Sequence, residues 1–178
     1  MANVRTPYLI ALAIFVVDQV SKFVMIGPLA LQARGSIKLL PIFDLTWVEN
    51  RGISLGLGQA SNDTQRWLLV AVTAAIALIV AWWIRREQQK GDRIALALVL
   101  GGALGNIVDR VRLGFVVDFL DLHFRGIPSY LCPSFDSGVC RPFLVFNVAD
   151  AAISIGVVIL LLRALFVRQA APEENIHA

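Results

Sequence analysis

Two aspartates stand out because each borders a long hydrophobic segment of the chain. Asp118 follows Gly-Phe-Val-Val, and Asp150 lies within Phe-Asn-Val-Ala-Asp-Ala-Ala. An ionised side chain at membrane depth costs roughly 2.5 to 3.5 kcal/mol on insertion scales, so a carboxyl group in such a place is a functional candidate. Two carboxyl groups that work together can supply one acid and one base.

Further polar residues interrupt the same hydrophobic segments at helical spacing. Asp18 and Lys22 are four positions apart, so they share one face of a helix. The other interrupting residues are Asn106, Asp109, Arg110 and Asn147. All of them are expected near the same membrane surface as the two aspartates. Residues that only join helices have no reason to share one depth, so this pattern predicts a single polar site that opens toward the outside.

The composition places the chain among membrane proteins. Of its 178 residues, 57% are hydrophobic and only 16% are charged, and the mean hydropathy is +0.71. About 20 apolar residues are needed to cross the hydrocarbon core as a helix. Four segments meet this requirement, so the sequence predicts one membrane domain over 1–178 with transmembrane helices at 7–26, 67–84, 94–111 and 147–166.

Basic residues predict the orientation of these helices. The short loop 85–93 contains four Lys or Arg residues, Arg85, Arg86, Lys90 and Arg93, which indicates the cytoplasmic side. With four helices, both termini are then cytoplasmic, and the long loops 27–66 and 112–146 face outward. The net charge of +3 is explained by this topology, and nucleic acid is not expected as a partner. Residues 171–178 are polar and are predicted to form a disordered tail.

The two outer loops have different local patterns. Residues 41–49 alternate and are rich in strand formers, which predicts a small sheet. The second loop contains both cysteines, Cys132 and Cys140, which an oxidising compartment would allow to pair. Two free thiols and a metal site with His123 and Asp136 are the alternatives, although these residues do not complete a recognised ligand spacing. Cysteine-based catalysis is disfavoured, because His123 is the only candidate base outside the tail.

Five motifs, in this order, resemble those of the bacterial lipoprotein signal peptidases, or signal peptidase II. The resemblance extends from Val17 to Ile153. The motifs are Val17-Asp-Gln-Val-Ser-Lys22, Glu49-Asn-Arg-Gly52, Gly101-Gly-Ala-Leu-Gly-Asn-Ile-Val-Asp-Arg110, Gly114-Phe-Val-Val-Asp-Phe119 and Phe146-Asn-Val-Ala-Asp-Ala151. A single motif is far less specific, since a glycine run, for example, also occurs wherever membrane helices pack closely. The five motifs together, in this order, are highly specific for this family.

The resemblance implies a membrane aspartic endopeptidase that removes the signal peptide from diacylglyceryl-modified prolipoproteins, cutting just before the lipidated cysteine. Asp118 and Asp150 match the catalytic pair, and Asp18 and Lys22 match structural polar positions. The positions that line the site are Asn50, Gly52, Asn106, Asp109, Arg110 and Asn147. From the residues themselves, Arg110 is expected either to hold Asp109 in a buried pair or to satisfy a buried backbone group. The segment between the two catalytic aspartates is long for the family, and it contains both cysteines.

The resemblance also implies the fold, the surroundings and the partners. The fold is an α-helical membrane protein with four transmembrane helices, a small extracytoplasmic β-sheet and a covering periplasmic loop or helix. The protein is expected in the bacterial inner membrane, with its site toward the periplasm. Its partners are the prolipoprotein, with its signal helix and diacylglyceryl-cysteine, and the membrane lipids. Globomycin-type cyclic peptides are expected inhibitors, and no cofactor or metal is expected.

Two other classes of function remain open at this point. A proton-coupled transporter or channel subunit would also carry buried Asp, Arg and Lys residues. Such a path needs polar residues across the full bilayer, whereas the segment 67–84 is interrupted only by Thr73. A non-enzymatic role as an assembly factor would not explain the paired aspartates. The sequence therefore favours the peptidase.

Overall fold

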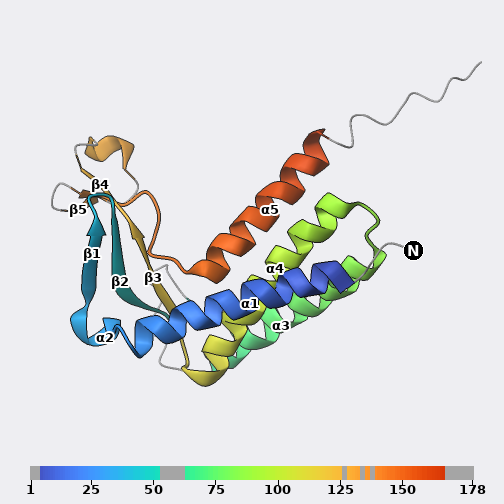
Figure 1. The fold of residues 1–178 in the computed structure, drawn as a ribbon, viewed down its shortest axis with the longest axis horizontal. Coiled ribbons are helices and arrows are strands. Elements are labelled where there is room, and N and C mark those ends of the chain that lie inside the picture. Colours follow the sequence, from blue (N-terminus) through green and yellow to red (C-terminus); the bar gives the residue numbers. More distant parts are fainter. Residues whose placement is uncertain (1–4, 53–62, 126–127, 133–134, 137–138, 167–178) are drawn as a thin grey trace, which may run out of the picture.

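Four long apolar helices form most of the molecule in the computed structural model (Figure 1), which describes residues 5–52, 63–125, 128–132, 135–136 and 139–166. The helices long and apolar enough to cross a membrane are α1 (Arg5–Ile26), α3 (Asp63–Arg86), α4 (Lys90–Arg112) and α5 (Val148–Phe166). The apolar patterns predicted all four, but α3 and α4 extend beyond the predicted bounds. Their additional turns contain charged residues, which a criterion based on apolar residues excludes.

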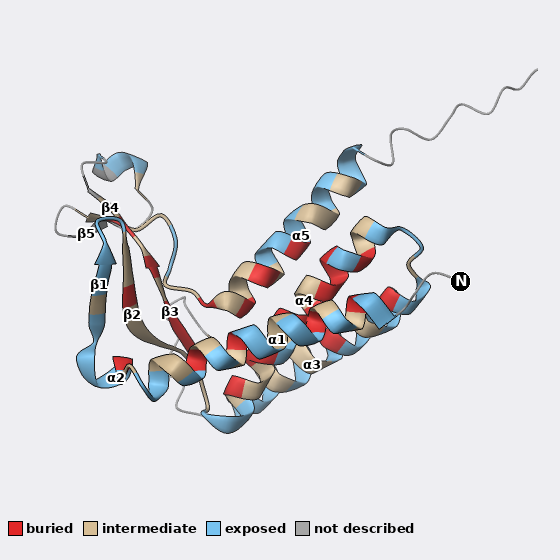
Figure 2. Cartoon of the chain, in the orientation of Figure 1, coloured by how far each residue is buried: buried red, intermediate tan, exposed pale blue. Residues whose placement is uncertain are grey.

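Helix α4 is the central helix of the bundle. It packs against α1, α3 and α5. Half of the residues in its 18-residue apolar stretch are buried, compared with 17% in the corresponding stretch of each of the other three helices. Figure 2 shows this difference as a concentration of buried residues along α4. Because protein rather than lipid surrounds α4, it can hold polar residues that the outer helices could not accommodate.

Glycines allow the other helices to approach α4 closely. A Cβ atom on Gly101 would lie 2.5 Å from the backbone oxygen of Ala11 in α1, and one on Gly102 would meet the backbone oxygen of Ala149 in α5. Backbone atoms cannot move aside as a flexible side chain can. The glycine run of the sequence thus allows α1 and α5 to pack against the same segment of α4, as small residues do in membrane helix pairs.

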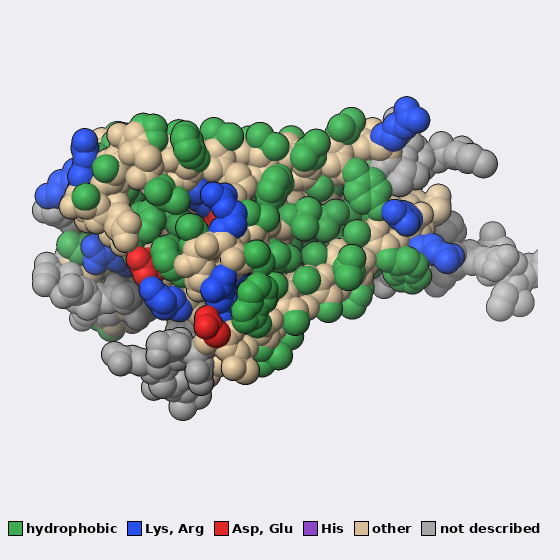
Figure 3. Space-filling model, turned by 90° about the horizontal axis from the view of Figure 1, so that it is seen from below, with side chains coloured by type: hydrophobic (Ala, Val, Ile, Leu, Met, Phe, Trp, Pro, Cys, Tyr) green, Lys and Arg blue, Asp and Glu red, His purple; other side chains and the backbone are tan. Residues whose placement is uncertain are grey.

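The outer faces of the helices are apolar and exposed. Leu9, Phe23, Leu68, Leu78 and Leu165 are examples of large side chains with more than half of their surface accessible. In Figure 3, hydrophobic side chains cover most of the helical part of the face shown. This surface suits contact with lipid chains, which is what the four apolar segments predicted.

A three-stranded antiparallel sheet continues from one end of the bundle, in the order β1, β2, β3. The strands are β1 (Ser36–Leu40), β2 (Phe43–Asn50) and β3 (Val116–Leu122), and the short helix α2 (Leu31–Arg34) precedes β1. Leu31, Leu45, Val117 and Phe119 form its buried core. The alternation at 41–49 predicted β2, whereas β3, which directly follows the loop after α4, was not predicted as a strand.

The chain between β3 and α5 forms a second, smaller sheet. It contains β4 (Phe124–Arg125), β5 (Phe135–Asp136) and β6 (Val139–Cys140) in the order β4, β6, β5, with a 3-10 turn, η1 (Ser129–Leu131). Cys132 and Cys140 are joined by a disulfide in the structure, with their Cα atoms 5.6 Å apart. The predicted tail at 171–178 and Asp136's side chain lie outside the described part of the chain.

Candidate active site

The two singled-out aspartates are brought together by one asparagine. Asp118 lies in β3 and Asp150 in the first turn of α5. The side chain of Asn147 donates a hydrogen bond to Asp118 Oδ1 at 2.6 Å, and its backbone N–H donates to Asp150 Oδ2 at 3.3 Å. Both Asp118 and Asn147 are almost fully buried. The structure therefore joins at one point two carboxylates that are far apart in the sequence.

A capping box fixes the position of Asp150. Asn147 directly precedes α5, and its side-chain oxygen accepts a hydrogen bond from the backbone N–H of Asp150 at 2.9 Å. The Asp150 carboxylate accepts the reciprocal bond from the backbone N–H of Asn147. This exchange satisfies two backbone donors that a helix start otherwise leaves without partners. It also limits the orientations available to the Asp150 side chain.

Asn106 of α4 completes the support of this pair. Its side-chain nitrogen donates to Asp150 Oδ1 at 2.8 Å, and its side-chain oxygen accepts from Asn147 Nδ2 at 3.3 Å. Each amide side chain thus donates to one of the two carboxylates, and the amides also bond to each other. Both asparagines were predicted to line the site; Asn147 contacts both aspartates, and Asn106 contacts Asp150.

A buried ionic cluster lies behind Asn106. Lys22 Nζ is 2.9 Å from Asp18 Oδ2, 2.7 Å from Asp109 Oδ2 and 3.3 Å from Asn106 Oδ1. Asp18 also accepts a hydrogen bond from the backbone N–H of Ala149 in α5, at 3.0 Å. The cluster therefore links α1, α4 and the start of α5. Buried charges are tolerated when they are paired and hydrogen-bonded in this way.

The expectation that Arg110 pairs with Asp109 was wrong. The ion-pair partner of Asp109 is Lys22, and Asp109 also accepts hydrogen bonds from the backbone N–H of Val117 and from Gln19 Nε2. Adjacent residues on a helix point in different directions, so Arg110 cannot follow Asp109 into the same cluster. Gln19, which lies within one of the five motifs, was not proposed as a site residue although it contacts both Asp18 and Asp109.

Asn50, Gly52 and Arg110 form a further group of residues near Asp118. Asn50 hydrogen-bonds Asp118, and its side-chain oxygen accepts from the backbone N–H of Gly52. Gly52 has a φ of 87°, and a Cβ atom there would lie 2.5 Å from Leu69 Cδ1 and 3.7 Å from Arg110 Nη2. This backbone conformation favours glycine. Among the described residues, Arg110 is one of few with a buried side-chain nitrogen, Nε, that has no hydrogen-bond partner.

Arg66 of α3 was also missed by the sequence analysis. It donates hydrogen bonds to the backbone oxygens of Arg110 and Val111, at 2.7 and 2.6 Å. These carbonyl groups belong to the last turn of α4, where they lack partners within the helix and where a cation is favoured. No sequence pattern identified this contact, because it joins the start of one helix to the end of the next.

The surroundings of Asp118 favour its neutral form. Burial, followed by the nearby charge of Asp150, raises the pKa of Asp118 from 3.8 to about 7, while hydrogen bonds from Asn50 and Asn147 partly oppose this change. Removal of water disfavours a charged carboxylate, and a like charge nearby has the same effect. Asp118 is therefore placed to hold a proton close to neutral pH.

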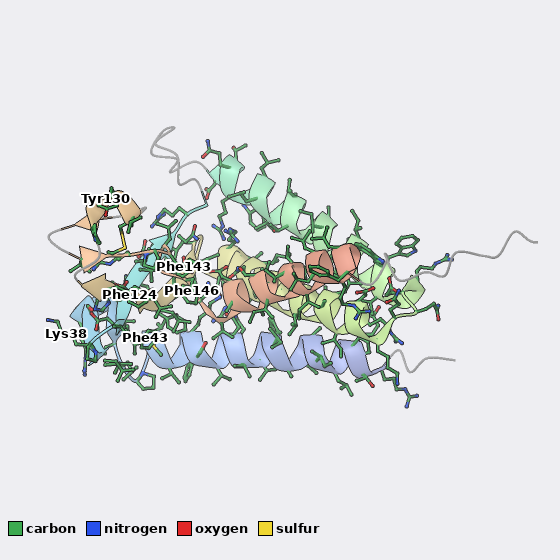
Figure 4. The ribbon with its side chains drawn as sticks, turned by 90° about the horizontal axis from the view of Figure 1, so that it is seen from above. Lys38, Phe43, Phe124, Tyr130, Phe143 and Phe146 are labelled. Atoms are coloured by element: carbon green, nitrogen blue, oxygen red, sulfur yellow. A yellow bond between two sulfur atoms is a disulfide. The ribbon has the colours of Figure 1, made fainter. Side chains whose placement is uncertain are left out.

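Two clefts open onto the pair. A cleft of about 360 Å³ is lined by Asp118, together with Asn50, Gly52 and Leu144. A second, mainly apolar cleft of about 300 Å³ is lined by Asp150, together with Leu144, Phe146 and Ser154. Figure 4 shows Phe143 and Phe146 at the junction between the sheet and the start of α5. The two carboxylates are thus accessible from two adjoining spaces.

Comparison with known proteins identifies the family. The family model described as "Signal peptidase (SPase) II" matches residues 10–166. This chain belongs to the signal peptidase II family. The lipoprotein signal peptidase of Sphingopyxis alaskensis is 52% identical over 180 residues, covering 98% of this chain and 96% of the relative. That of Rhizorhabdus wittichii is 54% identical over 170 residues, covering 95% and 91%.

Solved structures agree with this family assignment. A structure described as a bacterial membrane enzyme, solved by the in meso method at 2.3 Å resolution, has a TM-score of 0.73 and 26% identity, and the match covers 97% of this chain and 94% of that one. Another, at 1.9 Å resolution, has a TM-score of 0.70 and 27% identity, with 90% and 93% covered. The chain is therefore a multi-pass membrane peptidase, and the transporter alternative is not supported.

Proposed function

We propose that this signal peptidase II uses Asp118 and Asp150 to remove the signal peptide from diacylglyceryl-modified prolipoproteins, cutting just before the lipidated cysteine. The observation that carries the proposal is the contact of both carboxylates with Asn147, at 2.6 and 3.3 Å, beside two clefts. The relatives named as lipoprotein signal peptidases supply the substrate class. Two neighbouring carboxylates, one on a strand and one on a helix, both hydrogen-bonded to the same asparagine, are an arrangement suited to an aspartic peptidase.

In the proposed mechanism the pair holds one proton. Two adjacent carboxylates resist double ionisation, so they titrate as a unit. Because burial raises the pKa of Asp118 to about 7, we assign the proton to Asp118 in the free enzyme. Asp118 is then the acid and Asp150 the base.

Peptide cleavage then proceeds in two stages, each with a proton transfer at both aspartates. Asp150 accepts a proton from a water molecule as the water oxygen attacks the scissile carbonyl carbon, while Asp118 donates its proton to the carbonyl oxygen. When the tetrahedral intermediate collapses, the C–N bond breaks and the proton on Asp150 passes to the leaving nitrogen. As the C=O bond re-forms, one of the two hydroxyl groups of the intermediate returns its proton to Asp118, which restores the singly protonated pair. The products are a signal peptide with a new carboxyl terminus and a lipidated cysteine with a free amine.

The surrounding polar groups are proposed to bind and orient. Asn106 and Asn147 hold the carboxylates at distances of 2.6 to 2.8 Å. A Cβ atom on Gly52 would lie 3.7 Å from Arg110 Nη2, so the Arg110 guanidinium lies beside the Asp118 cleft, where its positive charge would stabilise the charge that develops on a substrate carbonyl oxygen. Asn50 and Gly52 line the Asp118 cleft, where they would contact substrate backbone. A donor already aimed at the position where charge develops stabilises the transition state without reorganisation.

We further infer the protein's place in the inner membrane. The basic loop 85–93 favours a cytoplasmic location for the α3–α4 connection, which puts both termini in the cytoplasm and the aspartates toward the periplasm. The lipid chains and the signal helix of the substrate would already lie in the membrane, so the substrate would reach the site by lateral diffusion. Globomycin-type cyclic peptides are expected to compete for the same clefts.

Cleavage of a diacylglyceryl-modified prolipoprotein by purified protein tests this function. Asp118→Asn and Asp150→Asn should each lose nearly all activity while remaining folded. Asp121→Asn is the matched control, because Asp121 is equally buried in β3 but contacts Thr46 and Arg141. It should keep cutting. An inert wild type, or full activity in either of the first two variants, would contradict the proposal.

A further inference from the structure

The segment that leads into α5 lines both clefts of the site. We call residues 141–146 the strap. Its last residue is held against β3, because Phe146 N donates to Leu120 O at 3.1 Å and Phe146 O accepts from the backbone nitrogens of Leu120 and Phe119 at 2.8 and 3.1 Å. Asn147, which orients both aspartates, follows immediately. One end of the strap is therefore fixed at the active site.

The other end of the strap is held by an ion pair. Arg141 Nε lies 3.3 Å from Asp121 Oδ1, and Asp121 also accepts a hydrogen bond from Thr46 at 3.0 Å. Cys140, directly before the strap, is buried, pairs with Phe124 in the small sheet and is bonded to Cys132. The strap is thus anchored to β3 at one end by side chains and at the other by backbone.

Between these anchors, the strap presents apolar side chains without burying them. Leu144 is 73% exposed and Phe143 is 61% exposed. Leu144 lines both the Asp118 cleft and the Asp150 cleft, whereas Phe143 lines only the latter. Leu144 consequently lies where the two clefts adjoin, beside the proposed catalytic pair.

We propose that Leu144 is a specificity-determining residue that contacts the substrate next to the scissile bond and limits the size of the residue before the lipidated cysteine. This inference rests on the proposed function. A peptide cleaved between Asp118 and Asp150 has to pass from one cleft to the other, and Leu144 borders that passage. A branched apolar side chain on an anchored backbone narrows the passage, so small substrate residues are favoured.

The test uses the purified full chain and two synthetic diacylglyceryl-cysteine peptides that differ only in the preceding residue, alanine or leucine. Discrimination by apolar pockets commonly amounts to about 10- to 200-fold. Leu144→Ala should therefore raise the kcat/KM for the leucine peptide, relative to the alanine peptide, by about tenfold or more. Because Leu144 is largely exposed, this variant is expected to fold.

Tyr130→Ala is the matched control. Tyr130 is 83% exposed and lies on η1, which precedes the strap between β3 and α5. It is not among the described residues that line either cleft. Its substitution should leave the ratio between the two peptides unchanged. Arg141→Gln removes the ion pair that anchors the strap. Like Leu144→Ala, it should raise the kcat/KM for the leucine peptide relative to the alanine peptide, mainly through a lower KM for the leucine peptide.

The outcomes separate this inference from the proposed function. If the wild type cleaves the alanine peptide but Leu144→Ala leaves the ratio as in the wild type, the role of Leu144 is refuted and the peptidase function stands. If the wild type cleaves neither peptide, the proposed function fails and the inference fails with it. If Tyr130→Ala changes the ratio as much as Leu144→Ala does, the effect is not specific to the strap and the inference is rejected.

Discussion

Asp118→Asn should stabilise the folded protein at pH 8 and leave its stability at pH 4 nearly unchanged. The pKa of Asp118 is raised from 3.8 to about 7, chiefly by burial and then by the charge of Asp150. Between about pH 4 and pH 7, the folded protein therefore keeps a proton that the unfolded chain has lost. The free energy of unfolding falls as the pH rises through this window, because the unfolded state binds fewer protons.

The size of the effect follows from the same pKa. One pKa unit corresponds to about 1.36 kcal/mol, so a rise of roughly three units costs on the order of 4 kcal/mol once Asp118 is ionised. Asparagine has nearly the same shape, and its side-chain oxygen can still accept the hydrogen bond from Asn147. The variant should thus avoid most of this cost at pH 8.

Unfolding by SDS in mixed micelles, followed by tryptophan fluorescence, measures this difference at both pH values. Asp121→Asn is the control, because it leaves Arg141 without its 3.3 Å partner and should lower stability at pH 8. Equal effects of Asp118→Asn at pH 4 and pH 8 would refute the reasoning. So would a wild type whose stability does not fall between them. Activity should respond in the same direction, with kcat/KM decreasing as the pH rises through about 7.

Two other variants test the surroundings of the site. Lys22→Met leaves Asp18 and Asp109, at 2.9 and 2.7 Å, buried without a cation, so we expect a loss of about 3–5 kcal/mol in SDS unfolding; a variant as stable as the wild type would show that the cluster does not depend on Lys22. For the disulfide, undenatured and unreduced protein should resist thiol labelling at Cys132 and Cys140 and become labelled after reduction, whereas labelling at both before reduction would show free thiols.

The sequence predicted the four membrane helices well. Long apolar segments predict membrane helices because the bilayer requires that length. Asn147 and Asp150 also have a local signature, since an asparagine three residues before an acidic residue at a helix start forms a capping box. The proximity of Asp118 to Asp150 came from the family resemblance, because no local rule links a strand to a helix that starts far along the chain.

The sequence was less informative about partners. Asp109 and Arg110 are adjacent, which suggested an ion pair, but Asp109 contacts Lys22 of α1. That contact depends on how α1 packs against α4, which the sequence pattern does not specify. The strand β3 was missed because most of its residues are buried, so it does not show the alternating pattern by which a half-buried strand is recognised. The anchoring of the strap by Arg141 and Asp121 likewise depends on tertiary structure.

The link between Asp18 and the start of α5 has a consequence for biosynthesis. Asp18 and Lys22 are four residues apart in the first helix, so they can neutralise each other as soon as that helix enters the bilayer. Asp150, by contrast, belongs to α5, the last helix in the described part of the chain, and Asn147 directly precedes it. A nascent chain therefore lacks the complete pair until α5 docks beside Asp18. On the proposed mechanism, ribosome-bound intermediates without α5 are inactive, and proteolytic activity begins only after α5 has been made.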